Sequence, residues 1–272
     1  MSDAAEARTT PPVRVEVDPA GVALVTVDHP PLNLYDDALH AALADAVSEL
    51  ERTTPRAALF RAEGKVVSGG VDVREVFHPM TTAGDVDAAT RYLAELVDLG
   101  ERIHRLPFPT VFAAHGLTLT WAFEVALACD LIVASPRASF GLIEATVGLT
   151  PAMGGTQRLA ERVGAGRARL FVMTAGRFGA EELAGWGAVD RLLPEEGFDA
   201  AARAFAATLA AGPTRAHAAT KEILRHLAEG GLDAANRHTP RIAGELFATE
   251  DLQGAMASFV EQGHGKATFR GR

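Results

Sequence analysis

The chain has 272 residues, of which 48% are hydrophobic and 22% charged, and its net charge is −9. This composition is typical of a globular protein and excludes disordered and collagen-like chains. A single cysteine, Cys129, excludes an internal disulfide and a zinc site built on several thiolates. The histidines lack the spacing of metal ligands, so we expect no metal, and the acidic charge makes nucleic acid an unfavourable partner.

The chain offers no segment suited to a bilayer. Its most apolar run, residues 122–134, contains Glu124 and Asp130 and is shorter than the roughly 20 residues that a membrane span requires. The first twelve residues lack the apolar core of a secretory signal. We therefore expect a disordered tail over 1–12, no membrane association and a cytoplasmic location.

Strands alternate with helices along most of the chain. Alternating residues predict a hairpin over 13–18 and 22–27. Apolar periodicity, caps and prolines then predict strands at 56–61, 110–114, 131–134 and 188–192, and helices at 36–50, 86–106, 120–128, 155–163, 167–174 and 180–186. Residues 139–151 are interpreted as mostly loop, and only helical patterns follow residue 198. This order predicts an α/β fold with a core over 13–197 and a helical region over 198–272.

Common catalytic motifs are absent from the sequence. It contains no phosphate-binding P-loop, no dinucleotide fingerprint, no zinc-protease helix and no hydrolase nucleophile elbow. Ser68 stands beside two glycines, where a serine is more often a turn residue than a nucleophile. The chemistry must therefore come from other side chains.

Two glutamates stand in unusually apolar surroundings. Glu124 lies in a helical segment whose neighbours one turn away are apolar, and Glu144 lies in a loop among small and apolar residues. Burial raises the pKa of a carboxyl group unless it has dedicated partners. Two such carboxyls facing one cavity would form a general acid–base pair. The alternative is that Glu124 bonds an arginine and Glu144 caps a helix.

Backbone N–H groups near these glutamates could bind a negatively charged oxygen. Thr120 is a suitable N-cap for the helix of Glu124, which would leave the N–H of Trp121 without an intrahelical partner. A second donor could come from the turn at 69–71, where glycines allow close approach of a ligand. Together the two would form an oxyanion hole, provided that the fold brings the segments together.

Four ordered blocks resemble the crotonase (enoyl-CoA hydratase/isomerase) superfamily over about 240 residues. They comprise the two oxyanion segments, a glycine-rich block and the C-terminal tail, at 68–74, 115–130, 140–159 and 249–272. The resemblance implies a crotonase-type spiral of ββα units followed by a helical trimerisation region over 198–272. It further implies a homotrimer or a dimer of trimers, with a coenzyme A thioester as substrate and no cofactor.

The resemblance also assigns roles to individual residues. The thioester oxygen would lie between the N–H groups of Val71 and Trp121, and Glu124 and Glu144 would add water across a 2,3-double bond. The CoA-binding candidates are Arg74, Lys65 and Asp72, of which Arg74 is the strongest. The acyl-pocket candidates are Trp121 and Ile143.

The sequence departs from the family pattern at three places. Thr120-Trp121-Ala122 replaces a run of glycines, Ile143 replaces a common proline, and Val71 is bulkier than usual. The indole of Trp121 either fills part of the acyl pocket or displaces the backbone of the oxyanion hole. Three hypotheses therefore stay open: a hydratase with a restricted or unusual acyl group, another crotonase reaction (isomerase, decarboxylase or thioester hydrolase), or a catalytically silent acyl-CoA-binding homologue.

Overall fold

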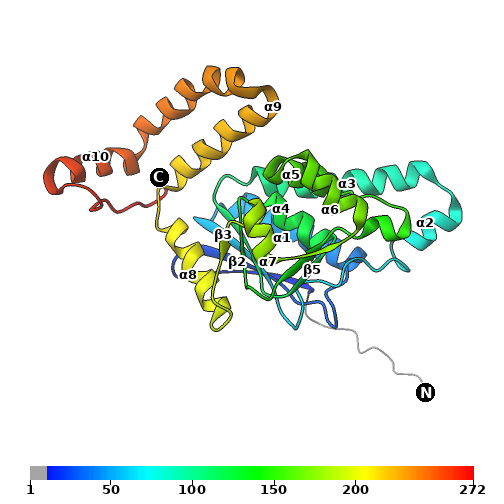
Figure 1. Ribbon diagram of the computed structural model, residues 1–272. Helices are drawn as coiled ribbons and strands as arrows, with labels where there is room; N and C mark the ends of the chain where they lie inside the picture. The colour runs from blue at the N-terminus through cyan, green and yellow to red at the C-terminus, as the bar shows by residue number, and fades with distance from the viewer. Residues whose placement is uncertain (1–10) are drawn as a thin grey trace.

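The computed structural model describes residues 11–272, whose strands form two sheets (Figure 1). β1 and β2 form the expected antiparallel hairpin, and the later pairings in the larger sheet are parallel. Most of the tail expected over 1–12 lies outside the described residues. The larger sheet contains, in spatial order, β1 (Val13–Val17), β2 (Val22–Val27), β3 (Ala57–Ala62), β4 (Thr110–Ala114), β6 (Leu131–Ala134) and β9 (Arg191–Leu192).

The smaller sheet consists of β5 (Leu117–Leu119), β7 (Ser139–Gly141) and β8 (Arg177–Gly179). None of these strands was predicted, because three residues carry too little alternation to be recognised. The helices between the strands are α1 (Asp37–Thr53), α2 (Phe77–Ala83), α3 (Val86–Arg105), α4 (Trp121–Ala128), α5 (Gly155–Val163), α6 (Ala165–Thr174) and α7 (Ala180–Trp186), with a 3-10 turn η1 (Glu144–Val147). Of these, α2 and η1 were also not predicted.

The six-stranded sheet is covered on both faces, because alternate residues of a strand point to opposite sides. In β3, Ala58 and Phe60 join a large core cluster that includes residues of α1, α3 and α4. Ala57 and Leu59 join a second cluster with α8 (Phe198–Ala210). The division expected between residues 197 and 198 stays a prediction, although α8 packs on the sheet with the core.

The helix α4 lies inside the protein, and all eight of its residues are buried. A helix that is apolar on every side is stable only in such a position. Glu124 is its one charged residue, so the fold carries a carboxyl group into the interior.

Residues 214–262 form a C-terminal arm that extends from the core (Figure 1). It consists of α9 (Thr214–Glu245), the 3-10 turn η2 (Leu246–Ala248) and α10 (Glu250–Gln262). The backbone of α9 leaves helical geometry at Gly230 and Gly231, where the arm bends. Within residues 11–272, no helix combines the length and apolar character needed to cross a membrane.

Candidate active site

The two backbone segments expected to form an oxyanion hole lie side by side. Ser68 and Thr118 form a parallel β-bridge, and the N–H of Leu119 donates to the carbonyl of Ser68 at 3.2 Å. Val71 and Trp121 each follow this bridge by three residues. The meeting of the segments, which sequence spacing alone could not establish, is therefore a feature of the fold.

The N–H of Val71 is left free by the pairing of its neighbours. The N–H of Tyr35 donates to the carbonyl of Gly70, and the N–H of Asp72 donates to the carbonyl of Tyr35, both at 2.9 Å. In this parallel bridge between Tyr35 and Val71, the N–H of Val71 points to the opposite side. No hydrogen bond from it to any of residues 11–272 is present.

The N–H of Trp121 is free because Trp121 is the first residue of α4. Thr120 occupies the N-cap position as expected, but its side chain makes no capping hydrogen bond. Its φ of 49° and ψ of −118° instead lie in a region that favours glycine. Thr120 therefore adopts a backbone conformation that glycine would adopt without strain.

Glu124 is held by the backbone at the start of α5. Its Oε1 accepts hydrogen bonds from the N–H groups of Met153 and Gly155, both at 2.8 Å. Burial raises the pKa of Glu124, while these donors and the positive charge of Arg158 oppose the rise. The alternative in which Glu124 pairs directly with an arginine is not what the structure shows, because its carboxylate bonds two backbone amides.

Glu144 is the first residue of η1 and is also buried. Burial, and then the negative charge of Glu124, raise its pKa to about 7. Its Oε2 has no hydrogen-bond partner among the described residues. The two carboxyl groups thus differ: one is fixed by backbone donors, and the other is free to exchange a proton near neutral pH.

Both glutamates line one cavity of about 30 Å³, together with Val71 and Trp121. Such a volume is close to that of one water molecule. Its remaining lining residues come from several elements and comprise Tyr35, Phe77, Tyr92, Leu96, Leu149, Thr150, Ala152 and Met153. Tyr35 and Tyr92 are the only tyrosines in the chain, and their convergence here was not predicted because they lie far apart in sequence.

The indole of Trp121 is anchored beneath the first oxyanion segment. Its Nε1 donates to Ser68 Oγ at 2.7 Å and approaches the carbonyl of Asn33 at 3.3 Å. The ring lies 5.4 Å from that of Tyr35, centroid to centroid. The side chain of Trp121 therefore reduces the cavity, while its backbone N–H has no hydrogen-bond partner among residues 11–272.

The other predicted site residues do not line this cavity. The side chain of Ile143 lies beside Gly141. The carboxylate of Asp72 accepts the backbone N–H groups of Arg74 and Glu75, so it stabilises the turn after Val71. Arg74 and Lys65 are exposed, and their predicted contact with CoA stays a prediction.

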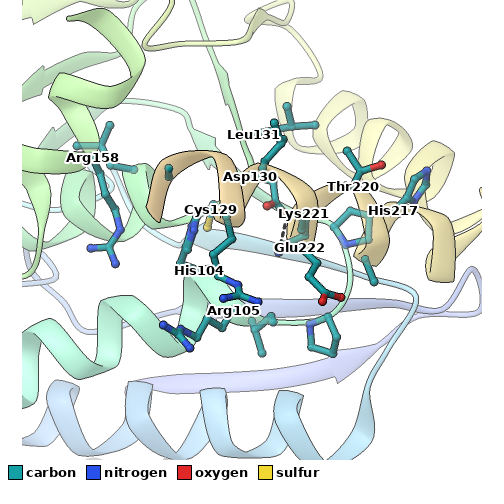
Figure 2. Close-up of a pocket in the computed structure, with 18 of the residues that line it drawn as sticks. His104, Arg105, Cys129, Asp130, Leu131, Arg158, His217, Thr220, Lys221 and Glu222 are labelled. Carbon is teal, nitrogen blue, oxygen red and sulfur yellow. Dashed lines mark hydrogen bonds and ion pairs between the residues drawn. The ribbon is translucent and has the colours of Figure 1, made fainter. Parts of the chain in front are cut away.

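A larger cavity, of about 770 Å³, lies between the core and α9 (Figure 2). Neither Glu124 nor Glu144 lines this larger cavity. Lys221 of α9 bonds Asp130 at 2.8 Å, and Arg162 bonds Asp190 at 3.0 Å. The first pair ties the arm to the core, and the second lies within the core. Glu124 and Glu144 line only the smaller cavity.

A family model described as enoyl-CoA hydratase/isomerase matches residues 18–272. The chain belongs to this family. A crystal structure of a Streptomyces coelicolor A3(2) protein has a TM-score of 0.89 and 32% identity, with 100% of both chains covered. This similarity confirms the expected α/β crotonase-type fold.

Curated members of the family are similar over nearly the whole chain. A Rhizobium meliloti protein named probable enoyl-CoA hydratase is 31% identical, covering 92% of this chain and 95% of its own. The short-chain-enoyl-CoA hydratase of Clostridium acetobutylicum is 29% identical, covering 89% of this chain and 92% of its own. Acyl-CoA thioesters are the substrates that family membership implies for this protein.

Proposed function

We propose that this protein is an enoyl-CoA hydratase that adds water to a short 2,3-unsaturated acyl-CoA. The observation that carries the proposal is the single cavity lined by Glu124, Glu144, Val71 and Trp121. An acid–base pair and two free backbone donors are what this reaction requires. The names of the related Rhizobium and Clostridium proteins support the same reaction.

The proposed mechanism follows from the different surroundings of the two carboxyl groups. Addition of water to the double bond transfers negative charge to the thioester oxygen, and the N–H groups of Val71 and Trp121 stabilise that enolate. One such donor contributes about 10²–10³ in rate in other oxyanion holes. Glu124, with two backbone N–H donors, takes the proton from water. Glu144, whose pKa lies at about 7, supplies a proton to C2.

The size of the cavity indicates the acyl group. A volume of about 30 Å³ holds only one water molecule, so any acyl group must displace side chains to enter, and a short acyl group requires the smallest displacement. The indole of Trp121 occupies space that the usual glycine would leave open, and its bond to Ser68 fixes it there. We therefore assign the protein a short, unbranched acyl group such as crotonyl.

Assembly and location extend the proposal. The C-terminal arm exposes large apolar side chains, including Phe247 (73%), Phe259 (58%) and Val260 (83%). Exposed apolar surface of this kind is typical of an interaction site. It supports the homotrimer or dimer of trimers expected from the sequence, which light scattering of the purified protein would measure. The cytoplasmic location and CoA contacts of Arg74, Lys65 and Asp72 stay part of the proposal.

A panel of acyl-CoA thioesters read by mass spectrometry tests the function. We expect crotonyl-CoA to gain the mass of one water molecule, and 2-hexenoyl-CoA to react more slowly. A product of unchanged mass but different chromatographic retention, loss of carbon dioxide, or release of free CoA, each without hydration, would identify another crotonase reaction. Binding of every thioester without turnover would identify a silent homologue.

A further inference from the structure

Thr120 carries a hydroxyl group whose position neither folding nor capping explains. The residue is only 5% exposed, and its Oγ1 has no hydrogen-bond partner among residues 11–272. At the N-cap of α4, a threonine would ordinarily bond an N–H of the first helical turn, and this one does not. A buried hydroxyl without a partner destabilises the folded protein.

The backbone of Thr120 adds a second unfavourable feature. A φ of 49° is rare for a β-branched residue and costs free energy that glycine would not. Glycine at this position would therefore remove both the strain and the unpaired hydroxyl. The threonine therefore lowers the stability of the folded protein in two ways. It does so between the two segments that supply the proposed oxyanion hole.

The hydroxyl lies where those two segments meet. Thr120 directly precedes Trp121, whose N–H is free. Its Oγ1 lies 3.4 Å from where a Cβ on Gly70 would stand, and Gly70 directly precedes Val71. The hydroxyl thus belongs to the residue before one backbone donor and lies close to the residue before the other. A ligand oxygen bound between these donors would supply the acceptor that residues 11–272 do not offer.

We propose that the hydroxyl of Thr120 is a third hydrogen-bond donor to the thioester oxygen. This inference rests on the proposed function and adds a catalytic residue to it. The hydroxyl keeps its proton throughout: it donates a hydrogen bond that strengthens as the carbonyl oxygen becomes an enolate. A donor that acts mainly on the enolate changes kcat more than KM.

Three substitutions separate this role from a structural one. Thr120→Val keeps the shape and the β-branch but removes the donor. Thr120→Ser keeps the donor, and Thr120→Gly removes the donor together with the strain. We expect Thr120→Val to lower kcat for crotonyl-CoA about 10- to 100-fold with little change in KM, and Thr120→Ser to stay within about threefold of wild type.

Thr120→Gly provides the sharpest distinction. We expect it to raise the thermal unfolding midpoint while lowering kcat, because strain is lost together with the donor. A residue with only a structural role would move stability and activity in the same direction. Equal kcat for Thr120→Val and wild type would overturn the inference.

Binding of acetoacetyl-CoA separates failure of this inference from failure of the proposed function. Its enolate resembles the proposed intermediate, and its absorbance reports the fraction ionised. We expect wild type and Thr120→Ser to bind the enolate about tenfold more tightly than Thr120→Val does. If wild type and Thr120→Val bind it equally, the third donor alone is wrong. If wild type does not bind it, the thioester site is wrong as well.

Discussion

The indole nitrogen of Trp121 donates a 2.7 Å hydrogen bond to the hydroxyl of Ser68. Ser68 belongs to the first oxyanion segment and Trp121 to the second, so this bond joins the two. Ser68 Oγ also donates to the carbonyl of Asn33 and accepts the N–H of Gly70. The residue that departs most from the family pattern is therefore integrated into the oxyanion hole.

This bond predicts measurable coupling between its partners. Trp121→Phe removes the buried donor, and Ser68→Ala removes its acceptor. We expect each to lower the free energy of unfolding by about 1–3 kcal/mol, measured by urea denaturation. The double variant should lose less than the sum by about 1 kcal/mol, because both single changes break one interaction. Strict additivity would show that the two side chains are energetically independent.

The indole is also expected to limit acyl length. Trp121→Leu enlarges the cavity beside the glutamates, so kcat/KM for 2-hexenoyl-CoA should rise at least tenfold relative to that for crotonyl-CoA. The matched control is Trp186→Leu, which changes the other tryptophan of the chain, on α7 beside Phe178. That control should lower stability and leave acyl preference unchanged. An unchanged preference in Trp121→Leu would place the acyl group elsewhere.

Gly155 allows the close approach of Glu124 to the start of α5. A Cβ at Gly155 would stand 2.7 Å from Glu124 Cγ, so Gly155→Ala must displace the carboxyl group. We expect steady-state kinetics to show a 10- to 100-fold lower kcat. Gly185→Ala, on α7, has nothing within 4 Å of its added Cβ and should retain full activity. Full activity in Gly155→Ala would remove the fixed position of Glu124 from the mechanism.

Glu144 should make stability depend on pH. Its pKa is raised from 4.5 to about 7 in the folded protein, so the folded state holds a proton that the unfolded state releases. Stability is therefore lost as pH rises from 4.5 to about 7. The measured quantity is the free energy of unfolding of Glu144→Gln minus that of wild type. This difference should be up to about 3 kcal/mol larger at pH 8 than at pH 4.

Urea denaturation at a series of pH values measures this difference. Glu181→Gln, which changes an exposed residue of α7, is the control for the loss of one carboxylate. A pH-independent difference between Glu144→Gln and wild type would mean that the pKa of Glu144 is not raised.

The sequence predicted the parts of the fold that local patterns determine. The hairpin and the helices α1 and α3 follow directly from residue periodicity and caps, as at Asp36, whose side chain accepts the N–H of Leu39. The strands β5, β7 and β8 are three residues long and depend on partners distant in sequence. Local periodicity therefore could not reveal the smaller sheet.

The candidate site divides in the same way. Glu124 and Glu144 could be singled out because a charge in an apolar segment is visible in the sequence. The convergence of Tyr35 and Tyr92 on the cavity, and the anchoring of Glu124 by Met153 and Gly155, depend on tertiary packing. The direction of the Trp121 indole likewise depended on Ser68, a contact across 53 residues.

The most direct test compares crotonyl-CoA hydration by wild type, Glu124→Gln, Glu144→Gln and the double variant. If the two carboxyl groups act as one acid–base pair, each single variant should lose at least about 10²-fold in kcat, and the double variant little more. Circular dichroism should show that all four proteins are folded. A folded single variant with the wild-type rate, or losses that multiply in the double variant, would contradict joint action of Glu124 and Glu144.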